Sequence, residues 1–244
     1  MDADLARLLP ADALLLGEQH DAPEHQRLQL QVVQALAARG QLAALALEMA
    51  EQGHGTASLG AAASSEQVRE ALDWNDALWP WAHYGPMVMA AVRGGVAVLG
   101  ANLPRAAMAD AMKNRALDDH LTGTLWQKQQ ESIRQGHCGL LPESQVLPMT
   151  RIQIARDAAM ARTVRAAARP GQTVLLVAGA WHVQRHLGVP THWPEGFQAR
   201  VVVARTQNSA ADAAETADAV WSTAAVAPVD HCSGFKETLE HARS

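Results

Sequence analysis

The sequence predicts an α/β fold: a mostly parallel sheet of about five strands, with helices on both faces and helical insertions over the carboxyl ends of the strands. Two observations predict it. Five short runs are almost continuously apolar, which is typical of strands that are covered on both faces. Helical patterns separate these runs, and alternating strands and helices favour parallel strands joined by right-handed crossovers.

The five predicted strands are residues 13–17, 43–48, 96–101, 173–179 and 200–205. The clearest helix follows the first strand, over residues 22–39. Asp21 is its expected N-cap, Pro23 lies in its first turn, and Gly40 ends it. These signals place a helix directly after the first strand, as a crossover connection requires.

A second helix is predicted over residues 149–168, where a row of arginines near the carboxyl end is expected to face solvent. The gaps between strands are longer than one crossover helix needs. We therefore predict a single α/β domain over residues 1–244, with helical insertions at about 50–95 and 106–172. The Ala-rich stretch from about residue 207 is expected to form a helix and a tail that packs back on the body.

Composition indicates a globular protein with a sizeable core, because 48% of the 244 residues are hydrophobic and 18% are charged. The net charge of -5 argues against a nucleic-acid partner. No run is long enough for a transmembrane helix. The opening "MDADLARLLP" does not resemble a secretory signal, which leaves a cytosolic chain and the mature form of an exported one as alternatives. Cys138 and Cys232 are expected to be two inert thiols rather than one bridge.

Polar residues follow every predicted strand, where ligands bind in open α/β sheets. In chain order they are Glu18 and His20, Glu48, Asn102 and Arg105, His182, and Arg205 with Thr206. Two strand ends share the form Gly-x-x-His, "GEQH" at 17–20 and "GAWH" at 179–182. Each glycine is expected to permit a sharp turn with positive φ.

Three interpretations of this cluster are open. Glu18, His20, Glu48 and His182 could hydrogen-bond one another as a polar lid. The same four side chains could ligate a divalent metal, or they could act as a general acid–base pair without one. His25 is expected to face the sheet, as either a site residue or a structural one. No Gly-x-Ser-x-Gly elbow and no phosphate-binding loop accompanies the strand ends.

The segments "LLLGEQHDAPEHQRLQLQVVQAL", "LALEM", "LGANLPR", "GAWHVQRHLGVP" and the terminal "DHC" resemble the ChaN-type cofacial haem-binding family. That family belongs to a superfamily with the Tiki proteases, the TraB proteins and the erythromycin esterases. The resemblance covers about residues 10–235. It implies a haem-binding protein of bacterial iron uptake, exported or membrane-anchored, that holds two haems face to face in a homodimer.

In that family a tyrosine phenolate ligates the iron, with a histidine nearby. Tyr84 is the single tyrosine of this chain. The resemblance implies that Tyr84 is the ligand, with Trp79 and Trp81 as walls, Arg105 at a propionate and Asn102 as a further cofactor-binding residue. A dimer partner could bring the histidine. The competing interpretation is that this aromatic segment only packs the first insertion onto the sheet.

The wider superfamily implies an alternative, a hydrolase with or without a metal. Its catalytic set would be Glu18, His20, Glu48, His182 and Arg105. One glutamate would act as the base toward water, the histidines would bind a metal or polarise the substrate, and Arg105 would stabilise developing negative charge.

Overall fold

The computed structural model describes residues 2–208, 216–227, 230 and 232–233. The chain forms two compact units, which are described separately. The first comprises Met1–Arg105 and Arg156–Ala225, and the second comprises Ala106–Ala155 and Val226–Ser244. That both belong to one domain stays a prediction.

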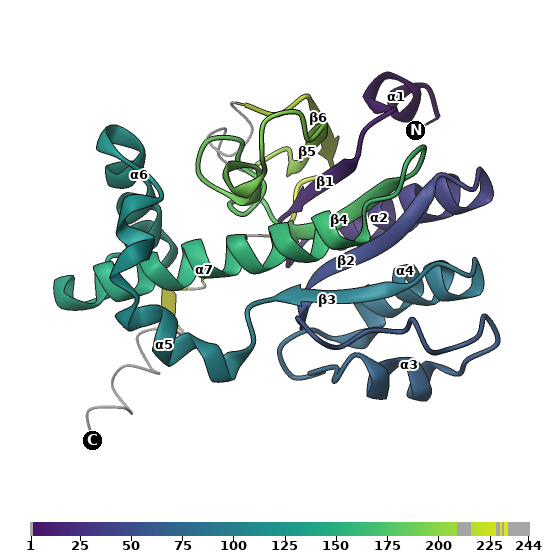
Figure 1. Ribbon diagram of the computed structural model, residues 1–244, viewed down its shortest axis with the longest axis horizontal. Coiled ribbons are helices and arrows are strands. Elements are labelled where there is room, and N and C mark those ends of the chain that lie inside the picture. The colour runs from purple at the N-terminus through teal and green to yellow at the C-terminus, as the bar shows by residue number, and fades with distance from the viewer. Residues whose placement is uncertain (1, 209–215, 228–229, 231, 234–244) are drawn as a thin grey trace. The chain divides into compact units, whose positions relative to one another are not determined.

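The first unit is built on a parallel sheet (Figure 1). In its described residues the six strands lie in the order β3-β2-β4-β1-β5-β6. Their bounds are β1 Ala13–Glu18, β2 Leu42–Glu51, β3 Val98–Asn102, β4 Thr173–Gly179, β5 Ala199–Thr206 and β6 Ala219–Thr223. The predicted fold class and five predicted strands are confirmed. Strand β1 lies at the centre, paired with β4 on one side and β5 on the other.

Strand β6 replaces part of the helix expected after residue 207, and residues 209–215 of that expectation lie outside the described part. Ala219 pairs with Val202 and Thr223 with Thr206, so β6 extends the sheet beyond β5. The Ala-rich composition favoured a helix, but the free edge of β5 offers backbone partners that local composition does not reveal.

Helices cover both faces of the sheet, as predicted. Helices α2 (Pro23–Ala38) and α4 (Trp81–Arg93) lie on one face, and the part of α7 (Glu143–Ala167) from Arg156 on lies on the other (Figure 1). The first insertion is helical, with α3 (Ser65–Ala71) before α4, and α1 (Asp2–Leu8) precedes β1. The cap of α2 differs from the prediction: Ala22 is the N-cap, and Asp21 instead accepts a hydrogen bond from Gln19.

The two faces carry side chains of different size, because successive strand residues point to opposite faces. Leu14 and Leu16 face α2 and α4, whereas Ala13 and Leu15 pack with the α7 side. The same alternation continues in β2, where Leu45 and Leu47 lie on the first face and Ala44 and Ala46 on the second. Small residues therefore predominate beneath α7, on the face that carries Asp157.

The second unit is helical. It contains η1 (Arg105–Ala107) from Ala106 on, α5 (Met108–Lys113), η2 (Arg115–Asp119), α6 (Gly123–Gly136) and the first part of α7. Arg151 forms a bidentate pair with Asp118, with N···O distances of 2.7 and 2.6 Å. Cys138 and Cys232 form a disulfide with a Cα–Cα distance of 5.7 Å. The expectation of two separate thiols is therefore wrong, because residues far apart in sequence meet in the fold.

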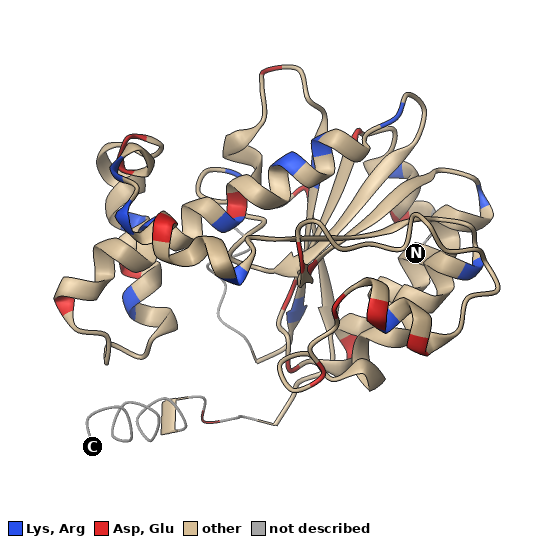
Figure 2. Ribbon diagram, turned by 60° about the horizontal axis from the view of Figure 1, so that its bottom comes forward, with Lys and Arg blue, Asp and Glu red and all other residues tan. Residues whose placement is uncertain are grey.

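The charged residues of the strands and of α7 lie where the sequence predicts them. The strands are tan along most of their length in Figure 2, and the acidic residues of β1 and β2 fall toward their carboxyl ends. Arg162, Arg165 and Arg169 are exposed, as predicted. Among the described residues, no helix combines the length and apolar character needed to cross a bilayer.

Candidate functional site

The Glu and His residues predicted at three strand ends meet at the carboxyl edge of β2, β4 and β1, which are neighbours in the sheet. Glu18, the last residue of β1, pairs in register with Gly179, the last residue of β4. His20 and His182 follow these two strands directly. Because parallel strands bring their carboxyl ends to one edge, residues on different strands that are 28 to 164 positions apart in sequence become neighbours.

The two Gly-x-x-His motifs make room for each other. A Cβ on Gly179 would lie 2.9 Å from Nε2 of His20, and a Cβ on Gly17 would lie 2.5 Å from a methyl group of Val183. The glycine after each strand therefore leaves room for the segment that follows the other strand. Neither glycine has the positive φ that the sequence suggested. Their role is close approach, which only a residue without a side chain allows.

Glu18 is an anchor at the base of the cluster and is 2% exposed. One oxygen accepts hydrogen bonds from the hydroxyl of Tyr84 and from Nδ1 of His20, both at 2.7 Å. The other accepts from the side-chain amides of Gln26 and Gln29. A carboxylate has about four acceptor positions, and all are used here. Glu18 therefore orients Tyr84 and His20 and has no lone pair left for a substrate proton.

Glu48 lies where β2 departs from regular pairing with β3, between Leu47 and Glu51. Such irregularities re-aim side chains near functional sites. One Glu48 oxygen accepts the backbone N–H of Gly179 at 2.7 Å and lies 3.8 Å from Nε2 of His20. The other lies 3.3 Å from Nε2 of His182. Glu48 therefore stands between the two imidazoles.

His182 is held from its other side by Asp157, which the sequence analysis missed. Nδ1 of His182 and Oδ1 of Asp157 are 2.5 Å apart, and both side chains are buried. Asp157 lies on α7, at the start of a stripe with Met160, Ala161 and Val164 that packs on the sheet. An acid on an otherwise apolar helical stripe is the sequence signal that could have found it.

The groups form a series, called here the acid–base series, in which carboxylates alternate with groups that can donate a proton: Asp157, His182, Glu48, His20, Glu18 and Tyr84. Burial lowers the pKa of His182, but the charges of Glu48 and Asp157 raise it to about 10. Burial raises the pKa of Glu48, but the charge of His182 and its hydrogen bond outweigh burial and hold that pKa well below its usual range. The inner pair is therefore an imidazolium and a carboxylate at neutral pH.

His20 is the member of the series that reaches solvent, with a side chain that is 38% exposed. Burial lowers its pKa, but its hydrogen bond to Glu18 and the charge of Glu48 raise that pKa overall. Its ring also meets the edge of Trp79, with centroids 4.8 Å apart. A partly exposed imidazole with a raised pKa can carry a proton between the cluster and a bound molecule.

Tyr84 has an environment unlike that of an iron-ligating phenolate. It is 1% exposed, its hydroxyl donates to Glu18, and the rings of Trp74 and Trp79 pack around it at 6.0 and 6.1 Å. Burial, reinforced by the charge of Glu18, raises the phenol pKa far above its ordinary value. As an iron ligand, Tyr84 would have to give up this bond and this enclosure.

The predicted metal ligands Glu18, His20, Glu48 and His182 are paired with one another. Within the part of the chain that the structure describes, no group of three or more His, Cys, Asp or Glu side chains is arranged to hold a metal ion. The polar-lid arrangement, in which the four residues hydrogen-bond or ion-pair within the cluster, is the one observed.

A pocket of about 490 Å³ opens beside the cluster. Its lining includes Glu48, Met49, Leu78, Trp79 and Arg105. Haem requires flat apolar walls, an axial ligand and cations for its propionates. Trp79, Leu78 and Met49 suit the walls, Arg105 suits a propionate, and the imidazole of His20 adjoins the lining through Glu48 and Trp79. The lining thus offers apolar walls and a cation for a haem, and that Tyr84 ligates the iron stays a prediction.

The acidic residues of the pocket restrict how a haem would lie. Glu51, Asp73 and Asp76 also line it. Propionates would be repelled there and favoured beside Arg105, which is exposed.

Two other predicted cofactor residues are engaged locally. Asn102 donates to the backbone oxygen of Glu48 at 3.0 Å and accepts the N–H of Leu103 at 2.9 Å. Trp81 packs edge-on against Trp74 at 5.0 Å and leaves no room for a Cβ on Gly85. These contacts favour the interpretation that Asn102 and Trp81 stabilise the insertion.

His25 is structural. It is fully buried, its Nδ1 accepts the backbone N–H of Gln19 at 3.0 Å, and its Nε2 lies 3.1 Å from the Thr223 hydroxyl. Burial lowers its pKa.

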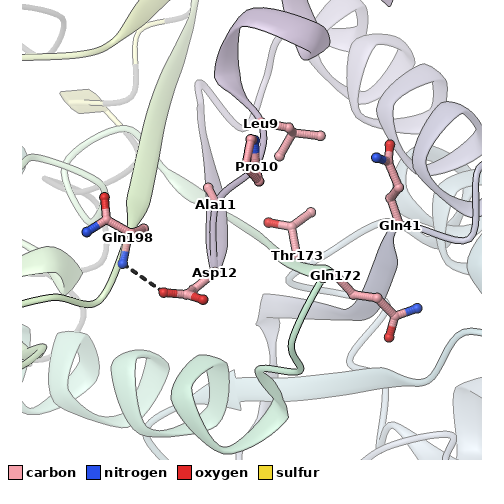
Figure 3. A pocket seen from close by; sticks show the side chains of 9 residues that line it. Leu9, Pro10, Ala11, Asp12, Gln41, Gln172, Thr173 and Gln198 are labelled. Carbon is pink, nitrogen blue, oxygen red and sulfur yellow. Dashed lines mark hydrogen bonds between the residues drawn. The ribbon is translucent and has the colours of Figure 1, made fainter.

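A different pocket, of about 190 Å³, lies at the opposite, amino ends of the strands (Figure 3). Its polar lining is mainly amides and a hydroxyl, from Gln41, Gln172, Gln198 and Thr173. Its one carboxylate, Asp12, accepts the backbone N–H of Gln198 (Figure 3). Without an imidazole it offers less chemistry, so we place the site at the carboxyl edge.

Comparison with known proteins agrees with this architecture. A solved structure described as cofacial heme binding to ChaN of Campylobacter jejuni superposes with a TM-score of 0.72 and 22% identity, over 86% of this chain and 88% of that one. The type III effector HopBA1 gives a TM-score of 0.48 and 16% identity, over 88% of both chains. No curated protein matches.

The model of the family described as haem-binding uptake, Tiki superfamily, ChaN matches residues 5–192, which include β1–β4 and all six members of the acid–base series. The chain therefore belongs to the ChaN haem-binding uptake family of the Tiki superfamily.

Proposed function

We propose that this protein binds haem in the pocket beside the carboxyl edge of the sheet, with the imidazole of His20 as the axial ligand. The observation that carries the proposal is the contact between a partly exposed imidazole and the indole of Trp79, which lines a pocket together with an arginine. Membership of a haem-binding family supports haem as the bound molecule.

Each residue has a defined part. Glu18 holds Nδ1 of His20, which leaves Nε2 as the iron ligand, and hydrogen bonding of the distal nitrogen is how proteins orient metal-bound imidazoles. Trp79 and Leu78 would provide apolar contact. Arg105 would meet a propionate. When bound, haem would supply an iron centre whose ligand field reports on His20 directly.

The experiment is a haemin titration of the purified protein, followed through the Soret band. We expect saturable binding of a single haem per chain, with the spectrum of a histidine-ligated ferric haem. His20→Ala should lose this spectrum. His83→Ala is the matched control, because His83 is an exposed histidine next to Tyr84 and should bind as the wild type does. Weak binding without saturation in the wild type would contradict the proposal.

We further propose that binding is cofacial and that the protein serves bacterial iron uptake as an exported homodimer. The C. jejuni ChaN structure, whose description names cofacial haem binding, motivates this step. Leu78, which lines the pocket, is 57% exposed and would be covered if a second chain brought its haem against the first. Light scattering before and after haemin addition tests the assembly, and a particle that keeps the monomer mass when saturated would exclude it.

A second candidate function, acid–base hydrolysis, is favoured by Glu48, which lines the pocket and also contacts both imidazoles. His20 is a better proton carrier than either glutamate, because Glu18 is saturated with donors and Glu48 has a strongly lowered pKa. Glu48 would instead stabilise positive charge on His20, and Arg105 would stabilise negative charge on a substrate.

Hydrolysis of p-nitrophenyl acetate by the haem-free protein tests this second function. His20→Ala should abolish turnover above background, and Glu48→Gln should shift its pH dependence. Arg162→Ala, on the exposed face of α7, is the control. If His20→Ala keeps wild-type turnover, the assignment of His20 as proton carrier fails.

A further inference from the structure

Asp157 has no role in the functions considered so far, although it is among the most deeply buried charged residues of the described chain, at 1% exposure. It lies in line with Met160, Ala161 and Val164 on the face of α7 that packs on the sheet. A carboxylate in such a place is costly unless it is paired. Among the described residues its hydrogen-bond partner is Nδ1 of His182, at 2.5 Å.

The geometry points to Asp157 as the positioning residue of His182: it fixes the proton of Nδ1 on its own side, so that Nε2 is directed at Glu48. His182 thereby links Asp157, at 2.5 Å, to Glu48, at 3.3 Å, through opposite nitrogens of one ring. Glu48 in turn lies 3.8 Å from His20. Asp157 thus acts on the pocket through two intermediaries and touches no bound molecule itself.

Two backbone hydrogen bonds fix the main chain of His182, so the orientation of its ring depends on its side-chain partners. The backbone N–H of His182 donates to Gly179, and its carbonyl accepts from Val189 at 2.8 Å. A Cβ on Gly188 would come within 2.0 Å of that carbonyl. The backbone is fixed, and the orientation of the imidazole is left to its two acids.

Asp157 keeps spare hydrogen-bonding capacity on its second oxygen. Among the described residues, Oδ2 of Asp157 is buried without a hydrogen-bond partner. A residue retained only to neutralise a buried imidazolium would be better placed with both oxygens bonded. One hydrogen bond, through Oδ1, is enough to orient Nδ1 of the His182 ring.

The assignment concerns His182 itself, and only its consequence for turnover rests on the proposed hydrolytic function. The test is therefore spectroscopic. In wild-type protein labelled with ¹⁵N-histidine, we expect a proton resonance far downfield of the amides that correlates with Nδ1 of His182. Its absence from the folded wild type would overturn the assignment without any variant.

Variants separate positioning from simple packing. Asp157→Asn conserves shape and should remove or strongly shift the Nδ1 resonance, and Asp157→Leu, which removes the buried acid altogether, should do the same in a folded protein. Glu48→Gln is the matched control, because it alters the partner of Nε2 and should leave the Nδ1 proton in place. An unchanged Nδ1 resonance in folded Asp157→Asn or Asp157→Leu would also overturn the assignment.

Turnover gives a separate readout. If the wild type hydrolyses p-nitrophenyl acetate, Asp157→Asn should lower kcat and leave KM near the wild-type value, because the residue does not contact substrate. A wild type that lacks activity removes the hydrolytic proposal and leaves the Nδ1 resonance as the test of Asp157. Loss of the resonance with turnover intact would instead show that His182 orientation does not serve catalysis, which overturns the functional part of the assignment.

Discussion

At the scale of single residues, the two strand-end glycines have different consequences although their motifs match. A Cβ on Gly179 would press on the far end of the His20 ring, which is partly exposed and can move. We therefore expect Gly179→Ala to leave the free energy of unfolding almost unchanged while displacing His20. Urea unfolding and a haemin titration measure the two effects. Gly60→Ala is the control, since nothing lies within 4 Å of its Cβ position.

Gly17→Ala should instead destabilise the fold. Its Cβ would meet a methyl group of the fully buried Val183 at 2.5 Å and the backbone of Ala180 at 3.1 Å. Overpacking of this kind costs about 1–3 kcal/mol. Urea unfolding of Gly17→Ala and Gly179→Ala in parallel checks the contrast, and equal losses of stability would contradict the reciprocal packing described above.

The phenol of Tyr84 gives a direct residue-scale test because the chain has one tyrosine. Burial and the charge of Glu18 disfavour the phenolate, so we expect no phenolate absorbance in the folded protein as the pH passes the ordinary tyrosine pKa of 10.0. Ionisation should appear together with unfolding, followed by circular dichroism. Reversible titration near the ordinary value would mean that Tyr84 is available to iron after all.

At the scale of elements, five strands and the helical character of both insertions could be predicted, because continuous apolar runs and long intervening segments are local features. Strand β6 could not, since an edge strand depends on the partner it finds in β5. The site was predictable as a set of residues at strand ends. The pairing of residues within the site could not be predicted, because Asp157, the partner of His182, lies on a helix that follows a separate insertion.

The disulfide belongs to the second unit and should matter to that unit. Cys138 and Cys232 are 94 residues apart in sequence. In the chain-entropy model, closing a loop of this length lowers the entropy of the unfolded chain and so stabilises the folded state by about 4–5 kcal/mol. We expect Cys138→Ser with Cys232→Ser to lower the melting temperature, and dithiothreitol to do so in the wild type only. Equal melting with and without reductant would show that the bridge contributes nothing.

A disulfide also bears on where the protein works. Bridges persist mainly in oxidising compartments, so the pairing supports the proposal that this chain is an exported protein. Thiol labelling of protein isolated from its native host would find both cysteines blocked if the proposal holds.

At the scale of the whole molecule, stability should depend on pH through His182. Burial lowers its pKa, but Glu48 and Asp157 raise it from 6.5 in the unfolded chain to about 10 in the folded one. Between these values the folded state binds the proton and the unfolded state does not. The contribution of His182 to the free energy of unfolding is therefore fully present below about pH 6.5 and is lost as the pH rises toward 10.

Urea unfolding at neutral pH and near pH 10 measures this loss. In His182→Asn the part of the pH dependence that arises from this residue should disappear. A wild type whose stability stays flat over the interval would contradict the imidazolium–carboxylate pairing at the centre of the cluster.

In the function proposed above, this ChaN-family chain holds haem iron through His20 while Tyr84 stays bound to Glu18. The most direct measurement is the absorption and electron paramagnetic resonance spectra of the ferric haem complex in Tyr84→Phe and His20→Ala. We expect Tyr84→Phe to keep the wild-type spectrum and affinity and His20→Ala to lose both. The opposite pattern, with loss in Tyr84→Phe and retention in His20→Ala, would contradict it and make the phenolate the ligand.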